Sequence, residues 1–471
     1  MRSTNAKVHE VIVVGTGLAG LNFVDKYLET HKKIDVISPV IKKSLNSKTG
    51  KEIKLLPSQM RGEYNTVNNY FYANNLKLER NCKAIGALNF GGLSNYWGLQ
   101  IDNYIQKDQI YLKKKTFTQI KNNFVEFLKR FNLVGSFNHK KKIIYKNNFN
   151  LPKELKSLNK FNNSKFLCSK PILAFTSSKN FKGDLNNLNE EKQKLTAYNI
   201  FKKIKKKNKI KIHNYYLQKV NKRKNFLELI CRNKGKKKKF LTKKLVLATG
   251  TIATTKIVMD FLNIKKEVKI KHHPRLLSVF FSTKKLDFNL NFTPSLLQIT
   301  RKSSKENFTA DLRPGNKLIT ESIIDAFPYM RPFKIIINFL RKRLMFSNFL
   351  YNPSLSNVYL KKIDNYFKIY SKNKDIGKVL RKKNKMVFNF LLRKKLIFPI
   401  YKTFFPGAGA DYHYFGSIPF HKSGKLAVNN NCQLLSARNI YIIDGSVFNF
   451  KSNKYPLGIV AANARRIAKF F

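Results

Sequence analysis

Three glycines near the N-terminus have the spacing of a phosphate-binding turn. Gly15, Gly17 and Gly20 follow a hydrophobic run at residues 11–14 in the pattern G-x-G-x-x-G. In such a turn the first glycine allows a sharp bend, the second lets the backbone approach a pyrophosphate, and the third allows a helix to pack on the strand. The start of the following helix would add free N–H groups and partial positive charge. The pattern predicts a dinucleotide site, with a purely structural glycine turn as the alternative.

The acid that usually accompanies this turn is absent. A second strand is predicted at residues 34–38, and it ends in Ser38, where a dinucleotide-binding fold usually has Asp or Glu for the ribose hydroxyls. A serine can hydrogen-bond a hydroxyl, but more weakly than a carboxylate does. We therefore expect a weakened ribose contact beside an intact pyrophosphate site.

A second nucleotide-binding signal lies at residues 242–250, TKKLVLATG. A hydrophobic strand that runs into Ala-Thr-Gly resembles the second signature of flavoproteins with two dinucleotide-binding folds. An ordinary buried strand followed by a glycine turn is the alternative. Together with the N-terminal turn, this segment favours FAD over NAD as the bound dinucleotide.

Three C-terminal segments, at residues 409–420, 426–448 and 453–470, resemble in their order the C-terminal signature of the glucose–methanol–choline (GMC) oxidoreductases. The segment FGGLSNYWG at residues 90–98 resembles the glycine-serine flavin loop of that family, and VKIKHHP at residues 268–274 resembles its short His-Pro segment. Each match is modest, and their order along the chain makes the resemblance specific.

The resemblance implies that FAD oxidises an alcohol by hydride transfer to flavin N5 while a histidine takes the hydroxyl proton. His413 occupies the position of that histidine, and an imidazole with a pKa near neutrality suits a general base. A turn histidine bonded to backbone is the alternative. Where the family usually has His or Asn before a proline, this chain has Tyr455, with Asn453 two residues earlier. Since a phenol both donates and accepts hydrogen bonds, we expect Tyr455 and Asn453 to orient the substrate hydroxyl.

The resemblance also implies a set of flavin contacts. Asp444 and Gly445 would meet the ribityl-phosphate part, and the glycine-serine loop would lie along the isoalloxazine. Tyr96 stands where some members carry a histidine bonded to the flavin, so FAD is expected to be non-covalent. No metal ligand is expected. The expected cofactor-binding residues are Gly15, Thr16, Gly17, Leu18, Gly20, Ser38, Gly91, Gly92, Ser94, Asn95, Leu217, Ala248, Gly250, Asp444, Gly445 and Pro456.

The substrate expectation rests on one further residue. Trp97 gives the flavin loop the form Gly-Gly-x-Ser-x-x-Trp, which resembles the sugar-oxidising branches of the family. It favours a sugar or polyol as the small-molecule substrate. The sequence leaves the electron acceptor open among oxygen, a quinone and another acceptor.

The 471-residue chain is strongly basic, with 93 Lys plus Arg against 26 Asp plus Glu and a formal net charge of +67. Compositional drift in an AT-rich genome is one explanation, and peripheral contact with an anionic membrane or an acidic saccharide is the other; nucleic acid is not expected. Residues 333–350 and 386–400 mix apolar side chains with Arg and Lys. We expect buried helices with snorkelling basic ends there, with a membrane-surface helix as the alternative.

The spacing of the cysteines and the lack of a recognisable targeting segment lead us to expect a cytoplasmic protein that is at most peripheral to a membrane. The four cysteines are far apart and form no CxxC, so neither a zinc site nor a disulfide framework is expected. The first predicted strand leaves no room for a signal peptide. No apolar run approaches the roughly 20 residues of a membrane span.

Together these patterns predict an α/β (α+β overall) fold, with a Rossmann-like FAD-binding domain and a smaller sheet-and-helix substrate domain. The FAD domain is expected at residues 1–110, 200–274 and 405–471, and the substrate domain at 111–199 and 275–404. The predicted function is FAD-dependent oxidation of an alcohol. The alternatives are another FAD or NAD oxidoreductase that shares only the βαβ start, and a non-catalytic GMC-like basic protein that binds a surface.

Overall fold

The hydrophobic run at residues 11–14 lies in the parallel part of a mixed sheet, between two parallel neighbours, as its pattern predicts. β1 (Val8–Val14) pairs in parallel with β2 (Lys33–Ile37) on one side and with β12 (Lys236–Leu247) on the other. All four side chains of the run are buried, as is typical of a central parallel strand covered on both faces. The full sheet runs β10 (Tyr216–Lys222), β11 (Leu227–Asn233), β12, β1, β2 and β9 (Lys209–His213), with β22 (Ala437–Ile442) attached to β12 and β21 (Gln433–Leu434) to β22.

The computed structural model of the chain describes residues 7–39, 66–96, 98–104, 108, 111–139, 142–159, 161–178, 181–205, 209–286, 288, 294–301, 308–315, 324, 328–372, 376–421 and 423–471. Its α-helices are α1 (Leu18–Tyr27), α4 (Thr66–Ala73), α5 (Lys114–Phe131), α6 (Lys153–Lys156), α7 (Glu190–Gln193), α8 (Ala197–Lys205), α9 (Thr251–Phe261), α11 (Lys334–Leu340), α12 (Ile376–Arg393) and α13 (Leu457–Ala468).

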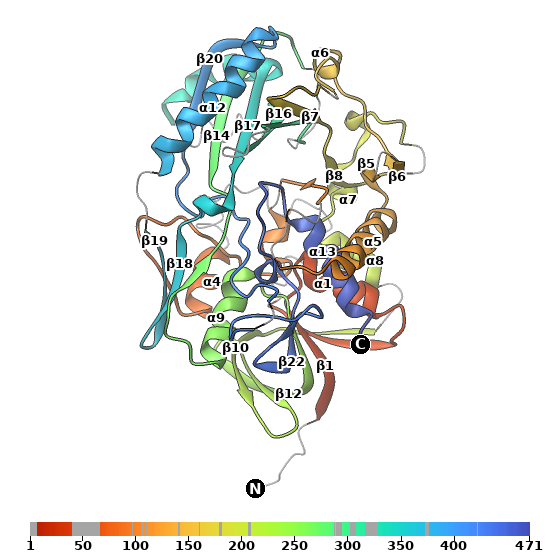
Figure 1. The fold of residues 1–471 in the computed structure, drawn as a ribbon, viewed down its shortest axis with the longest axis vertical. Coiled ribbons are helices and arrows are strands. Elements are labelled where there is room, and N and C mark those ends of the chain that lie inside the picture. The colour runs from red at the N-terminus through yellow and green to blue at the C-terminus, as the bar shows by residue number, and fades with distance from the viewer. Residues whose placement is uncertain are drawn as a thin grey trace.

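A second, antiparallel sheet lies at the opposite end of the long axis of the molecule (Figure 1). The helix α12 packs against two of its strands, and Phe388 of α12 stacks on Tyr401 with ring centroids 4.0 Å apart. The strands follow one another in the order β20 (Ile397–Phe404), β14 (Arg275–Ser282), β17 (Leu344–Tyr351), β16 (Phe308–Pro314), β15 (Leu297–Arg301) and β7 (Phe166–Ser169).

Two four-stranded sheets connect these ends. One contains β13 (Val268–Ile270), β18 (Val358–Ile363), β19 (Tyr366–Ser371) and β3 (Leu76–Leu78), and the other contains β4 (Gln100–Ile101), β8 (Ile172–Thr176), β5 (Leu133–His139) and β6 (Lys142–Asn147). The predicted class is confirmed: a Rossmann-like sheet with helices and a second part of sheets and a helix. The exact domain boundaries stay a prediction, because each four-stranded sheet joins strands from the expected FAD domain with strands from the expected substrate domain.

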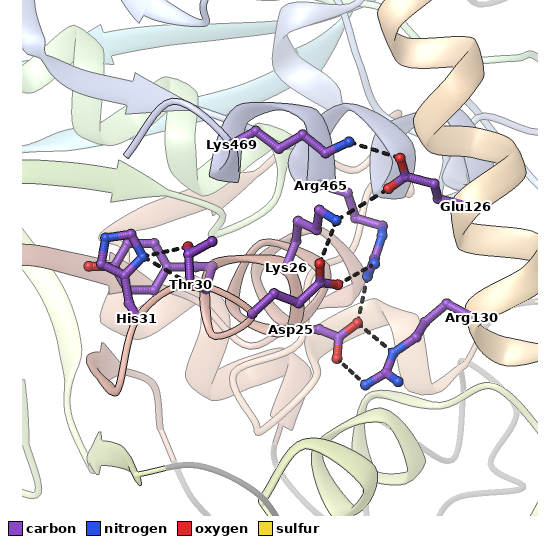
Figure 2. A network of polar contacts seen from close by, with 10 residues as sticks. Asp25, Lys26, Thr30, His31, Glu126, Arg130, Arg465 and Lys469 are labelled. Carbon is purple, nitrogen blue, oxygen red and sulfur yellow. Dashed lines mark hydrogen bonds and ion pairs between the residues drawn. The ribbon is translucent and has the colours of Figure 1, made fainter.

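Ion pairs tie the helices α1, α5 and α13 together (Figure 2). The Asp25 carboxylate on α1 accepts from Arg465 Nη1 on α13 at 2.5 Å and from Arg130 Nη2 on α5 at 2.7 Å. Burial would raise the pKa of Asp25, but the bonds and charges of the two arginines outweigh it and lower that pKa. On the rim, Glu126 pairs with Lys26 at 3.4 Å and with Lys469 at 2.8 Å. The network holds α1 against α13.

The expectation of buried helices at residues 333–350 and 386–400 is only partly right. Residues 386–393 end α12, which buries its apolar face, whereas Ile397–Phe404 is an edge strand. In the other segment, α11 exposes its apolar side chains, residues 341–343 form a 3₁₀ turn, and residues 344–350 belong to the buried strand β17. The physical reason is that β17 lies inside a sheet with partners on both sides, which a helix in that place would not have.

None of the helices in the described part of the chain combines the length and the apolar character needed to cross a bilayer. Among the described residues, no three His, Cys, Asp or Glu side chains are grouped so that they could hold a metal ion. The four cysteines are free and buried.

Candidate functional site

A cavity opens where β1 ends and α1 begins. It brings together segments from both ends and the middle of the chain. Most of the residues expected from the sequence line it: Gly15, Thr16, Gly17, Leu18, Ser38, Gly91, Gly92, Ser94, Leu217, Ala248, Gly250, His413, Asp444, Gly445 and Pro456. Four of the expected residues are not in the lining: Gly20, Asn95, Asn453 and Tyr455.

Each glycine of the N-terminal turn has a separate geometric role. Gly15 has φ +105°, and a Cβ there would lie 2.3 Å from the carbonyl oxygen of Ala248. A Cβ on Gly20 would lie 2.1 Å from the oxygen of Gly15, so this glycine lets α1 pack on the turn and does not face the cavity. A Cβ on Gly17 would meet only the Gly91 oxygen, at 3.7 Å, and Gly17 lines the cavity. The bend at Gly15, the helix packing at Gly20 and the open backbone at Gly17 therefore lie where the spacing predicts them.

Ser38 is joined to the turn by a short chain of hydrogen bonds. Its hydroxyl lies 2.7 Å from Thr16 Oγ1, which also accepts the N–H of Gly91 at 3.0 Å. Both hydroxyl side chains are buried and both residues line the cavity. The residue in the place of the usual acid thus links the N-terminal turn to the glycine-serine loop.

Three helices begin at the cavity wall, and none has a side-chain N-cap or an acid in its first turn. The unpaired N–H groups and the dipole of a helix start favour negative charge. The lining residues at these three starts are Gly17, Leu18 and Ala19 of α1, Thr251, Ile252 and Ala253 of α9, and Pro456, Leu457 and Val460 of α13. The cavity can therefore hold a ligand that carries anionic or carbonyl oxygens at several points.

Asp444 hydrogen-bonds both to the start of α9 and to its own turn. Its Oδ2 accepts the N–H of Gly250 at 3.0 Å and the hydroxyl of Thr254, while Oδ1 accepts the N–H of Ser446 at 3.0 Å. Burial raises the pKa of Asp444 in spite of these donors. A Cβ on the next residue, Gly445, would lie 2.6 Å from the Tyr414 oxygen, so only glycine fits there. The carboxylate positions the turn, which leaves the glycine backbone facing the cavity.

His413 is the titratable base in the lining. Its Nδ1 is buried and has no hydrogen-bond partner within the described structure, and its ring meets the ring of Tyr455 edge to face at 5.1 Å. Burial lowers the pKa of His413 to about 4, with Asp411 acting in the opposite direction. The imidazole is therefore neutral near pH 7 and can accept a proton.

Asp411 and the two histidines it holds were not selected as site residues from the sequence. Asp411 Oδ1 lies 2.8 Å from His272 Nδ1, and Oδ2 accepts the backbone N–H of His273 at 2.9 Å. Burial lowers the pKa of His273 to about 3. The carboxylate thus anchors the loop that bears His413 to the His-Pro segment. An acid two residues before His413, in a chain poor in acids, was the available signal.

Tyr455 and Asn453 direct their polar atoms away from the cavity. The hydroxyl of Tyr455 donates to Asp311 Oδ2 at 2.8 Å, and Asn453 Nδ2 donates to Thr309 Oγ1 at 2.8 Å. Both acceptors belong to β16 of the antiparallel sheet. The side-chain amide of Asn95 likewise donates to the Phe90 oxygen within its own loop, at 2.7 Å.

The residue behind the sugar expectation, Trp97, lies outside the described residues. Its neighbour Tyr96 belongs to the same glycine-serine loop, and its hydroxyl accepts from Asn89 Nδ2 at 2.9 Å.

No protein-family model matches this chain, and no curated protein matches it in sequence. Among solved structures, the fold is similar to that of a pyridoxine 4-oxidase from Mesorbium loti, with a TM-score of 0.57. The match covers 98% of this chain and 99% of that chain at 10% sequence identity. At this identity the likeness establishes a shared fold along nearly the whole of both chains.

Proposed function

We propose that this protein is an FAD-dependent oxidoreductase of the GMC type that oxidises an alcohol, with His413 as the general base. One observation carries the proposal. A single cavity is lined by the glycine turn, by three helix starts without side-chain caps, and by a neutral histidine whose Nδ1 has no partner within the described structure. That a solved protein of this fold is an oxidase of a small molecule gives further support.

The residues of the cavity fit FAD in its separate parts. The backbone of residues 15–18 would hold the pyrophosphate, since Gly17 is open and α1 begins there. Ser38 would bind the adenosine ribose. Gly445 and the start of α13 would face the ribityl and isoalloxazine parts, together with the loop that contains Gly91. FAD held there would supply the acceptor for the hydride of the alcohol carbon, and we propose that it is held without a covalent bond.

His413 supplies the proton acceptor for this reaction. Because burial keeps the imidazole neutral, one ring nitrogen is free to take the hydroxyl proton as the C–H bond breaks. Asp411 favours the protonated form of His413 after the transfer, since its negative charge raises the pKa of that histidine. We further propose a substrate domain at residues 111–199 and 275–404, and a sugar or polyol among the candidate substrates.

The test is reconstitution with FAD followed by anaerobic reduction with a panel of sugars, polyols and pyridoxine. We expect a bound flavin spectrum that at least one alcohol bleaches. A His413→Ala variant should keep the flavin and lose about 10²–10⁴-fold in bleaching rate. The same substitution at His31, which stacks on Tyr27 at the end of α1, should leave the rate unchanged.

The outcomes separate the alternatives. Absence of any flavin spectrum would reject the proposal, and NAD binding in its place would favour an enzyme that shares only the βαβ start. Bound flavin that no alcohol bleaches would favour a non-catalytic protein. Equal bleaching by His413→Ala and the unmodified protein would remove His413 from the role of base.

A further inference from the structure

Arg275 presents an unneutralised cation beside the proposed base. It is the first residue of β14, and its guanidinium carbon lies 5.4 Å from the ring centroid of Tyr412, which lines the cavity next to His413. The side chain is half-buried, and its Nε is buried without a hydrogen-bond partner. Its positive charge is one of the influences that lower the pKa of His413.

The neighbouring arginine shows the contrast. Arg313 also acts on the pKa of His413, but its Nε lies 2.7 Å from Asp311 Oδ2. Within the described ranges, no carboxylate forms an ion pair with Arg275. A guanidinium has five N–H donors in a fork that matches an oxyanion, and burying part of it without a partner has a free-energy cost. The guanidinium of Arg275 therefore has the charge and the N–H donors to bind the anion of a ligand.

The position of Arg275 distinguishes the source of that anion. The pyrophosphate of FAD would be held by residues 15–18, at the end of β1 in the mixed sheet, whereas Arg275 lies on the antiparallel sheet, against Tyr412 and close to His413. Resting on the function proposed above, we propose that Arg275 binds an oxyanion of the substrate, which is an alcohol that also carries a carboxylate or a phosphate. The hydroxyl to be oxidised then faces His413 while the anion is held over Tyr412.

The experiment compares alcohols that differ only by the anion, using FAD-loaded protein. Glycerol is paired with glycerol 3-phosphate and glucose with glucuronate, so that the phosphate and carboxylate arms are separate. We expect the anionic member of a pair to bleach the flavin at lower concentration. In Arg275→Gln that half-saturating concentration should rise by about 10–100-fold, the range for hydrogen bonds to a charged group, with the neutral member unchanged. Arg275→Lys should restore part of the loss.

The matched control is Arg381→Gln, which removes the same charge from an exposed position on α12. If Arg381→Gln weakens the anionic alcohols as much as Arg275→Gln does, general attraction by the basic surface explains the preference and the proposal is wrong. Equal use of neutral and anionic alcohols would also overturn it.

A separate measurement keeps this inference distinct from the proposed function. Calorimetric titration with oxalate and with inorganic phosphate, neither of which can be oxidised as an alcohol, reports anion binding with or without flavin. Binding that Arg275→Gln abolishes supports the anion site even if no alcohol bleaches the flavin. Bleaching by neutral alcohols without anion binding leaves the oxidoreductase and rejects the anion site.

A different part of the molecule carries a second inference, namely a helical run that exposes its apolar side chains. The run consists of a 3₁₀ turn (Pro328–Phe333), α11 and a second 3₁₀ turn (Arg341–Arg343). The exposed fractions of Ile335 and Phe339 are 82% and 76%, and those of Ile336 and Phe333 are 55% and 50%. Clustered apolar side chains at such exposure mark an interaction site.

Charge identifies the occupant. The run contains Arg331, Lys334, Arg341, Lys342 and Arg343 and has no acid between residues 328 and 343. A second copy of the chain would bring the same basic side chains to the contact, which opposes self-association. An anionic bilayer accepts both the apolar and the basic groups. We infer that this run, residues 328–343, docks the protein on an anionic lipid surface.

Flotation with vesicles tests this docking surface. We expect the protein to bind vesicles that contain phosphatidylserine with phosphatidylcholine, and to bind phosphatidylcholine alone more weakly, with added salt reducing the difference. The double variant Ile335→Ser with Phe339→Ser should lose binding by about 100-fold or more, because two apolar side chains no longer enter the bilayer. Tyr72→Ser, at an 86% exposed residue of α4, should bind as the unmodified protein does.

Two results would overturn this inference. One is equal flotation of the double variant and the Tyr72→Ser control. The other is a concentration-dependent dimer in sedimentation that the double variant abolishes, which would assign residues 328–343 to a contact between copies.

Discussion

The ring of Tyr455 meets the ring of His413 edge to face, with planes at 88°, while its hydroxyl donates to Asp311 on the opposite sheet. One side chain therefore touches the proposed base and bridges to β16. Its backbone N–H also donates to Asp102 Oδ2 at 2.7 Å. Tyr455 thus supports the wall behind His413, and its hydroxyl is already engaged.

Tyr455→Phe should therefore affect stability more than chemistry. The variant keeps the ring beside His413 and loses the bond to Asp311, whose Oδ2 still pairs with Arg313. We expect the free energy of unfolding to fall by about 1–2 kcal/mol, measured by urea denaturation. The flavin bleaching rate should stay close to that of the unmodified protein. A loss as large as that of His413→Ala would instead place the Tyr455 hydroxyl on the substrate.

Stability should fall with acidification below about pH 6.5. The pKa values of His413 and His273 are lowered from 6.5 to about 4 and about 3, so the unfolded chain takes up these protons first. Stability from this source is complete above the unfolded pKa and falls by up to about 1.4 kcal/mol per pH unit for each histidine as pH decreases. Asp411, with its pKa lowered from 3.8, contributes only at lower pH.

Urea denaturation between pH 7.5 and 4.5 measures this dependence. In His413→Ala the slope should be shallower, because one of the two groups is removed. A slope that does not change between the unmodified protein and the variant would contradict the assignment.

Asp411→Asn should weaken His413 as a base without displacing it. The amide can still accept the N–H of His273, but the charge that raises the pKa of His413 is gone. We expect bleaching about 10-fold slower, a part of what a general base contributes, and the acid limb of the pH–rate profile displaced to lower pH. Asp364→Asn, the same change in an exposed hairpin turn, is the control. A slower rate with an unmoved profile would indicate a purely structural role.

Asp25→Asn should destabilise the fold while leaving the site chemistry intact. It removes the carboxylate that lies 2.5 Å from Arg465, which is 2% exposed, and leaves that arginine with the longer pair to Glu29 Oε1 at 3.3 Å. Breaking one partner of a buried ion pair costs about 3–5 kcal/mol, which thermal or urea unfolding would detect. Glu126→Gln removes a half-exposed pair and should cost less than about 1 kcal/mol. Equal losses in the two variants would show that the Asp25 network is not specially stabilising.

The sequence by itself determined the features that depend on local backbone geometry. The sharp bend at Gly15, with φ +105°, is a local backbone conformation that favours glycine, so the spacing of the glycines reveals it. Buried strands such as β1 follow from continuous apolar runs for the same reason. The C-terminal block around His413 resembles a known order of short motifs, and the structure places it at the same cavity as the turn.

Only the tertiary structure decided which partners the polar and apolar side chains have. The bond from Tyr455 to Asp311 spans 144 residues, and that from Asp411 to His272 spans 139. The same holds for the exposure of α11, since an identical apolar pattern packs a core or faces solvent according to what lies opposite. Hydrogen bonding and burial act between atoms close in space, and the chain order does not specify which distant segments will meet.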